Sequence, residues 1–276
     1  MNGRKFAVII ALLLVAVIVV IGAIDCLQYL RTSKICTLID QGDTTAAIQY
    51  INKTPDVNRY TAPVWMRGIL SRLFEQDVQL PLVVACENGN LAVVMALLEQ
   101  GADPNRYLKG NWSPVEAAII GREETRLDIV KALAANGADV DHFGSYQSAL
   151  FAELSMLAYT ESTEEERVLT EEIIKFFLEN GASPVEEDGN TLVHYLAYAG
   201  YLDTLKAFYP TYSDYLNAQN EKGETPLMWA AGDGKTSVVE YLIACGADIA
   251  ISDAGGRTAY DHAVEQGYSE LDALLS

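Results

Sequence analysis

Apolar residues follow two different patterns along this chain. Residues 6–24 form one uninterrupted apolar run, FAVIIALLLVAVIVVIGAI, without a charged side chain. Beyond residue 35, shorter apolar stretches recur at helical spacing, as in VVEYLI at residues 238–243. The first pattern predicts one long apolar helix, and the second predicts a series of short helices that each bury one face.

The N-terminal run has the length of a membrane-spanning helix. Its 19 residues would cover about 28 Å as a helix, close to the roughly 30 Å hydrocarbon core of a bilayer. The apolar region of a signal peptide is usually about 7–15 residues long, so we expect an uncleaved signal anchor. Gly22 and Ala23 leave cleavage open as the alternative. Arg4 and Lys5 precede the run and predict a cytoplasmic N-terminus with the rest of the chain outside.

The remainder of the chain repeats itself with a period near 33 residues. The segment TPLMWAA begins at Thr225, TAYDHA begins 33 residues later at Thr258, and TLVH begins 34 residues earlier at Thr191. A glycine follows each of these threonines after nine residues. A second motif of the type GAD closes apolar stretches in the same rhythm, at Gly101, Gly137, Gly181 and Gly246.

Each part of this repeat has a physical role in a pair of helices. Threonine or serine caps the first helix, and proline suits its first turn, where no backbone N–H is needed. The small Ala pair lets neighbouring helices approach closely, and the ninth-position glycine ends the helix. One unit alone cannot bury its apolar face, so the units are expected to stack.

These motifs resemble the ankyrin repeat family, which has a 33-residue unit. The resemblance covers residues 33–276. It implies an all-α solenoid of helix-turn-helix units with β-hairpin loops, here placed after an N-terminal transmembrane helix. Leu80 and Ser113 stand where the pattern has threonine, Gly121 comes one place early, and the unit that begins at Ser148 is degenerate.

Spacing between the motifs sets the expected organisation of the chain. We expect about seven repeat units, two of which carry insertions. The predicted segments are a short tail at 1–5, a signal anchor at 6–24, a juxtamembrane linker at 25–34, the ankyrin-repeat domain at 35–276, and insertions near 59–78 and 160–170.

The acidic charge of the chain limits which classes of partner it can bind. The 276 residues carry 38 Asp and Glu against 19 Lys and Arg, with a mean hydropathy of +0.10. The net charge is +3 over residues 1–34 and −22 over residues 35–276. An acidic domain is unsuited to neutralising nucleic-acid phosphates, so we expect a protein partner with a basic surface and no nucleic acid.

No arrangement of residues indicates catalysis. The histidines are His142, His194 and His262, and they lack the cysteine spacing of a zinc site. We find no phosphate loop and no nucleophile elbow. We therefore expect no enzyme, no cofactor, no metal and no small-molecule substrate. His194 is expected to hydrogen-bond neighbouring loop backbone. The acidic loop at residues 186–188 is interpreted as solvated, with a cation site as the alternative.

The resemblance also implies where a partner binds. Ankyrin proteins use a concave face made of hairpin tips and first-helix residues. Carried over by position, the candidate partner-binding residues are Arg106, Tyr107, Lys109, Trp112, Phe143, Tyr146, Glu186, Glu187, Asp188, Glu221, Lys222 and Glu224.

We expect Trp112 to occupy a solvent-facing place and Trp229 to lie in the core. Other units have a polar residue at the place of Trp112, for example Asn190 or Glu224, which predicts that this place faces solvent. The indole of Trp112 is then either a binding hot spot or folded onto Tyr107 or a neighbouring helix. Trp229 lies between the Leu and Ala places of a first helix and is expected in the core.

These inferences define a hypothesis about function. We expect a protein-protein interaction module held at the membrane, with an inhibitor or immunity protein for a toxin or hydrolase as its more specific version. The alternative is a structural scaffold or sensor of an envelope assembly. A short chain with one anchor and a plain architecture suggests a bacterial source.

Overall fold

The structure is a computed structural model. It describes residues 30–58, 80–108, 112–121, 124–141, 148–159 and 163–276, together with Val20, Leu27 and Gln28. The predicted anchor at 6–24, apart from Val20, and the predicted insertion at 59–78 lie outside the described residues. Within the described part of the chain, no helix combines the length and the apolar character needed to cross a membrane.

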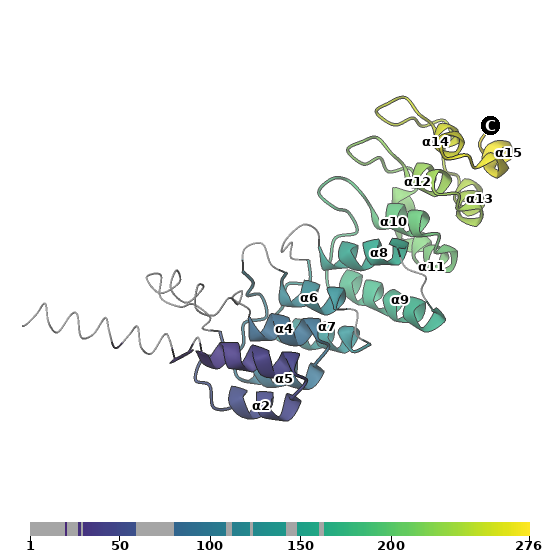
Figure 1. The fold of residues 1–276 in the computed structure, drawn as a ribbon. Coiled ribbons are helices and arrows are strands. Elements are labelled where there is room, and N and C mark those ends of the chain that lie inside the picture. Colours follow the sequence, from purple (N-terminus) through teal and green to yellow (C-terminus); the bar gives the residue numbers. More distant parts are fainter. Residues whose placement is uncertain are drawn as a thin grey trace, which may run out of the picture. The chain divides into compact units, whose positions relative to one another are not determined.

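The chain divides into two compact units, Met1–Asp139 and Val140–Ser276. In the first unit, residues 30–40 are helical and helices then follow in pairs (Figure 1). The α4 helix packs on α6, and α5 packs on both α2 and α7. The helices are α2 (Thr44–Ile51), α4 (Pro81–Glu87), α5 (Leu91–Glu99), α6 (Pro114–Ile120) and α7 (Arg126–Ala135).

The second unit contains the longer stack. Its first helices pack in the order α8, α10, α12 and α14, and α11 packs on α13 in the second row (Figure 1). The helices are α8 (Ala149–Tyr159), α9 (Glu164–Glu179), α10 (Leu192–Ala199), α11 (Leu202–Tyr212), α12 (Pro226–Gly232), α13 (Thr236–Ala244), α14 (Ala259–Gln266) and α15 (Asp272–Leu275), with short 3₁₀ turns at Ser213–Tyr215 and Ser269–Leu271.

The predicted caps determine where the first helices start. The side chains of Thr191, Thr225 and Thr258 each accept a hydrogen bond from the backbone N–H three residues later. Ser113 forms a reciprocal capping box with Glu116, although it replaces the threonine of the pattern. Such a cap contributes about 1 kcal/mol to helix stability, so every first helix of this kind has a defined start.

Close approach between first helices depends on small residues. The pairs Ala117–Ala118 and Ala230–Ala231 are at most 1% exposed. Gly121 has an ordinary helical φ of −60°, but a Cβ added there would overlap the carbonyl oxygen of Glu87 at the end of α4. Glycine at this position is therefore required by the neighbouring helix and not by its own backbone conformation.

The loops between repeat units have the predicted hairpin form with very short pairing. Val185 and Thr191 form an isolated antiparallel bridge. Successive loops are joined through the backbone, because the Glu221 N–H donates to the Asp188 oxygen at 2.9 Å and the Ala254 N–H donates to the Lys222 oxygen at 2.8 Å. These bonds hold the loops in a fixed row beside the first helices.

The acidic segment predicted as an insertion at 160–170 is largely helical. Thr163 caps α9 through a reciprocal box with Glu166, and α9 extends for 16 residues, against 11 in α11. The additional residues therefore lengthen the second helix of this repeat, while residues 160–162 lie outside the described part.

Candidate binding site on the first-helix face

A pocket of about 430 Å³ opens on the first helices of the second unit. Its lining combines aromatic and polar side chains from four successive repeats. The lining residues are Ser155 from α8, Tyr195 and Tyr198 from α10, Met228, Trp229 and Gly232 from α12, and His262 and Gln266 from α14.

Repetition of the sequence explains why the rings gather here. Tyr195, Trp229 and His262 each lie four residues after the capping threonine of their helix, so stacking of the units places them in one row. The ring centroids of Tyr195 and Trp229 are 5.6 Å apart at 75°. Tyr198 meets Trp229 in the same edge-to-face manner at 5.9 Å. Trp229 is thus the centre of an aromatic cluster.

Carboxylates lie at the polar edges of two of these rings. The Tyr195 hydroxyl donates to Glu186 Oε2 at 2.6 Å, and the indole N–H of Trp229 donates to Glu224 Oε2 at 3.0 Å. Both acids belong to loops that precede the helices they contact. Neither carboxylate is itself a lining residue, but each is bonded to a ring that lines the pocket. We call Glu186 and Glu224 the acidic rim of this aromatic pocket.

The two rim carboxylates differ in their protonation equilibria. Burial raises the pKa of Glu186, even though the hydroxyl of Tyr195 donates to it. Burial also opposes ionisation of Glu224. Hydrogen bonds from Trp229 and Asn220, together with the nearby Lys222 and His262, outweigh burial and hold the pKa of Glu224 below the usual value. Glu224 is therefore the more firmly charged of the two acids.

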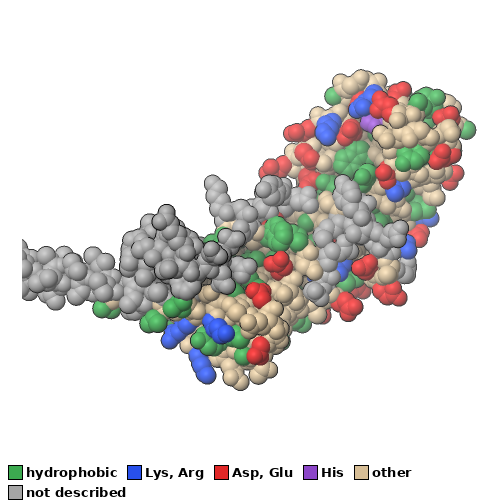
Figure 2. All heavy atoms as spheres, in the orientation of Figure 1, with side chains coloured by type: hydrophobic (Ala, Val, Ile, Leu, Met, Phe, Trp, Pro, Cys, Tyr) green, Lys and Arg blue, Asp and Glu red, His purple; other side chains and the backbone are tan. Residues whose placement is uncertain are grey.

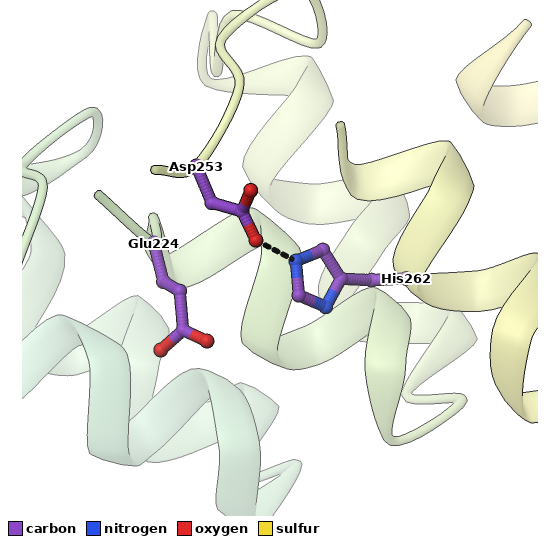
Figure 3. Close-up of side chains that lie close together, drawn as sticks. All are labelled: Glu224, Asp253 and His262. Atoms are coloured by element: carbon purple, nitrogen blue, oxygen red, sulfur yellow. Dashed lines mark hydrogen bonds and ion pairs between the residues drawn. The ribbon is translucent and has the colours of Figure 1, made fainter. Parts of the chain in front are cut away.

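Glu224 also belongs to a second cluster, with Asp253 and His262 (Figure 3). Their potential ligand atoms lie within 4.8 Å of one another. Asp253 is buried, and its Oδ2 accepts bonds from Arg257 at 2.7 Å and from His262 at 3.1 Å. Backbone and side-chain N–H groups of Arg257 hold the pKa of Asp253 well below its usual range. Arg257 already supplies the positive charge, so this cluster acts as a structural network.

Charge divides unevenly between the two units. Residues 140–276 contain 24 Asp and Glu against six Lys and Arg, a net charge of −18, whereas residues 1–139 contain 14 against 13. Acidic side chains are spread over the visible face of the second unit in Figure 2, with hydrophobic ones between them. The pocket therefore lies in the strongly acidic part of the chain.

Eight of the twelve predicted binding residues belong to the second unit by residue number, and six of these are described. Glu186 and Glu224 form the acidic rim, and the other four, Glu187, Asp188, Glu221 and Lys222, are exposed. Arg106, Tyr107 and Trp112 are half-buried in the first unit. Lys109, Phe143 and Tyr146 lie outside the described residues.

Trp229 does not lie in the core as expected. Its side chain is half-buried, lines the pocket and contacts the rings of His194, Tyr195 and Tyr198. The sequence signal was its position, four residues after a capping threonine, which Tyr195 and His262 share. Comparing that place across units would have identified the aromatic row.

The place of Trp112 is also less exposed than expected. Asn190, at the equivalent place, is buried and hydrogen-bonds Asp188 and Asn220. Asn190 is thus held by its own loop and by the next one, so a polar residue at this place does not indicate exposure. Trp112 is accordingly half-buried and is not a freely exposed indole.

His194 has the predicted structural role. It is fully buried, and its Nε2 lies 3.0 Å from the backbone oxygen of Glu224 in the next loop. Its Nδ1 lies 2.9 Å from the hydroxyl of Thr191. Burial lowers the pKa of His194 to about 4, so the ring is neutral at pH 7 and links two repeats.

The fold and this site define a class of protein, a helical repeat protein with a preformed binding face. Residues 64–143 and 193–276 match the family model described as ankyrin repeats in three copies. The chain therefore belongs to the ankyrin repeat family, whose domains are typically binding modules without catalytic activity. The predicted family and the all-α solenoid are confirmed.

Relatives support the same assignment. The chain is 30% identical over 191 residues to the putative ankyrin repeat protein FPV230 of Fowlpox virus, covering 69% of this chain and 94% of that one. It is 42% identical over 55 residues to ankyrin repeat family A protein 2 of Mus musculus, covering 20% of this chain. That match spans 18% of the mouse protein, less than a fifth of its length.

Two solved structures are similar to this fold. The human ASB11 ankyrin repeat domain gives a TM-score of 0.66 at 20% identity, covering 87% of this chain and 96% of that one. A complex of the predatory endopeptidase Bd0816 of Bdellovibrio bacteriovorus with the immunity protein Bd3460 also matches. Its immunity protein gives a TM-score of 0.58 at 26% identity, covering 70% of this chain and 95% of the matched one.

Proposed function

We propose that this protein binds another protein through the first-helix face of its second unit and the adjoining loops. The observation that carries the proposal is the half-exposed aromatic row around Trp229, which lines a pocket of about 430 Å³. Large aromatic side chains in such positions dominate the energy of many protein interfaces. A polar rim around an apolar patch is also typical of an interaction site.

The partner is proposed to present a basic surface. The second unit carries a net charge of −18, which attracts positively charged surfaces and steers their approach. The acidic residues Glu187 and Asp188 are exposed in the loop that leads into α10, the helix that supplies Tyr195 to the pocket. This is the charge pattern that a basic partner complements.

The more specific proposal is inhibition of a hydrolase. Its support is the 26% identity with an immunity protein seen in complex with a predatory endopeptidase, across 95% of that matched chain. In such a role the first-helix face would cover a partner's active site. A scaffold or sensor of an envelope assembly is the competing proposal, and it predicts a captured partner without hydrolase activity.

We place the binding domain at a membrane, also as a proposal. It rests on the apolar sequence of residues 6–24 and on the basic residues Arg4 and Lys5 before it. The charge bias predicts that the repeats lie outside the cytoplasm. Digestion of the repeat domain by protease added to intact cells would support this topology, and full protection would contradict it.

Capture of a partner by the full chain tests the proposed face. Trp229→Ala should weaken a captured partner's affinity at least tenfold, because truncation of a central aromatic anchor costs about 2 kcal/mol or more. Val168→Ala is the matched control, since Val168 is 51% exposed on the second-row helix α9. Equal effects of the two substitutions on the dissociation constant would rule out the pocket as the binding site.

Hydrolase assays then separate the two specific proposals. If the captured partner cleaves a peptide substrate, the full chain should inhibit it, and Trp229→Ala should raise the inhibitory concentration in parallel with the dissociation constant. If a captured partner keeps its full hydrolase activity, the result favours the scaffold proposal over the inhibitor proposal.

A further inference from the structure

We infer that the pocket around Trp229 receives an arginine side chain of the partner. This inference rests on the proposed protein-binding function and specifies its central contact. Three features of the pocket carry it: the aromatic walls, the two carboxylates hydrogen-bonded to those walls, and the acidic unit in which they lie.

The walls consist of aromatic side chains, a class of side chain that attracts cations. Trp229 is the side chain type with the strongest cation–π attraction, which acts within about 6 Å of the ring centroid. Tyr195 and Tyr198 lie edge-to-face around it. A volume of about 430 Å³ falls within the range of small-molecule pockets, roughly 300–1,000 Å³, so a long side chain can enter with water.

The rim supplies negative charge at the end of the pocket walls. Glu224 accepts from Trp229 and Glu186 accepts from Tyr195. Glu224 also accepts from Asn220, but an ionised carboxylate has about four lone-pair sites, so capacity remains for a further donor. An apolar occupant would desolvate these acids without compensation, and an acidic occupant would be repelled.

Neighbouring basic side chains do not cancel this charge. Arg257 is paired with Asp253 and Glu265, and Lys235 is paired with Asp233. Lys222 lies close enough to lower the pKa of Glu224, but it is exposed and its charge is screened by solvent. The rim therefore retains an attraction for an incoming cation.

Arginine fits this arrangement better than any other side chain. Its planar guanidinium stacks on aromatic rings, and its fork of donors matches carboxylate oxygens. Stacking on Trp229 and donation to Glu224 or Glu186 use the two parts of the pocket together. The partner's arginine would thus insert into the face that the aromatic row forms.

A peptide probe tests the inference without the partner. We would titrate the full chain, ¹⁵N-labelled and in detergent micelles, with acetyl-Gly-Arg-Gly-amide. The matched probe is the citrulline peptide, which keeps the shape of arginine and removes its charge. The readout is the indole N–H signal of Trp229, assigned by its loss in Trp229→Phe.

The expected result is a saturable shift of that signal with a dissociation constant on the order of a few millimolar for arginine. Citrulline should bind at least tenfold more weakly. Glu186→Gln combined with Glu224→Gln should weaken the arginine peptide at least tenfold, whereas Glu240→Gln, an exposed change on α13, should leave it unchanged. Thermal unfolding would verify that each variant is folded.

Equal shifts with the two peptides, or no shift with arginine at tens of millimolar, would overturn the inference. If a partner is captured in a Trp229-dependent manner but the double glutamine variant retains its affinity, the inference also fails while the proposed function stands. If the arginine peptide binds as expected and no partner engages this face, the pocket's preference stands and the proposed function fails.

Discussion

Adjacent residues of one helix have opposite roles in these repeats. Three residues after the capping threonine, His194 and Met228 are buried and complete the cap. One residue further on, Tyr195 and Trp229 turn to the pocket. Successive residues of a helix differ in direction by about 100°, so a shift of one place separates core from binding face. The sequence predicted the hydrogen bond of His194 to loop backbone, but it placed Trp229 in the core because the packing of the next helix was unknown.

The buried His194 makes stability depend on pH. The unfolded chain binds a proton at this site near pH 6.5 and the folded chain near pH 4. The folded state therefore binds fewer protons between these values, and the free energy of unfolding falls as pH drops through this window, by up to about 3 kcal/mol. Well above pH 6.5 the histidine is neutral in both states, so it adds no pH dependence to the free energy of unfolding.

His194→Gln should remove that contribution. Urea unfolding at pH 4, 5 and 7 should give the variant a smaller loss of unfolding free energy between pH 7 and pH 4 than the wild type has. The many carboxylates titrate in both proteins, so the difference between the two curves isolates the histidine. If the unfolding free energies of the two proteins changed in parallel with pH, the burial of His194 would be contradicted.

At the scale of helices and loops, the period of the sequence predicts most of the structure. The caps at Thr191, Thr225 and Thr258 and the glycines nine residues later lie where the pattern placed them. The sequence did not predict the lengthening of α9, because an acidic insertion is equally compatible with a loop and with a helix. Its capping box at Thr163 and Glu166 favours the helix, because it satisfies two backbone N–H groups at the helix start.

Gly121 offers a test of helix packing. Gly121→Ala should lower the free energy of unfolding by about 2 kcal/mol, because the new methyl group would force α4 and α6 apart. Gly232→Ala is the control, since its Cβ would come no closer than 3.7 Å to His262. Chemical denaturation measures both, and similar values for the two variants would exclude a specific contact at Gly121.

At the scale of the whole molecule, the net charge is distributed unevenly between the two units. The sequence predicted an acidic repeat domain, but 18 of the 19 net negative charges belong to residues 140–276. The boundary between the two compact units shows that these charges belong to one structural unit, which the sequence alone did not indicate. Eight of the twelve binding residues carried over from the family also fall in this part. The family pattern locates the loops but does not state which unit carries the charge.

Association with a basic partner should accordingly depend on salt. We expect the association rate constant to fall on the order of tenfold between low and high ionic strength. Glu187→Gln with Asp188→Asn, both exposed in the second unit, should lower the rate at low salt, whereas Glu99→Gln in the first unit should not. Stopped-flow measurements decide this, and a rate indifferent to salt would argue against steering by charge.

The pocket walls come from four consecutive repeats, and this has an evolutionary consequence. Each repeat contributes one or a few wall residues, while its cap, its buried helix faces and its loop-to-loop bonds belong to the common framework. Exchange or duplication of a single repeat could therefore replace His262 and Gln266 while Trp229 stayed in place. A lineage could change its recognition target in steps of about one repeat, keeping a folded protein at every step.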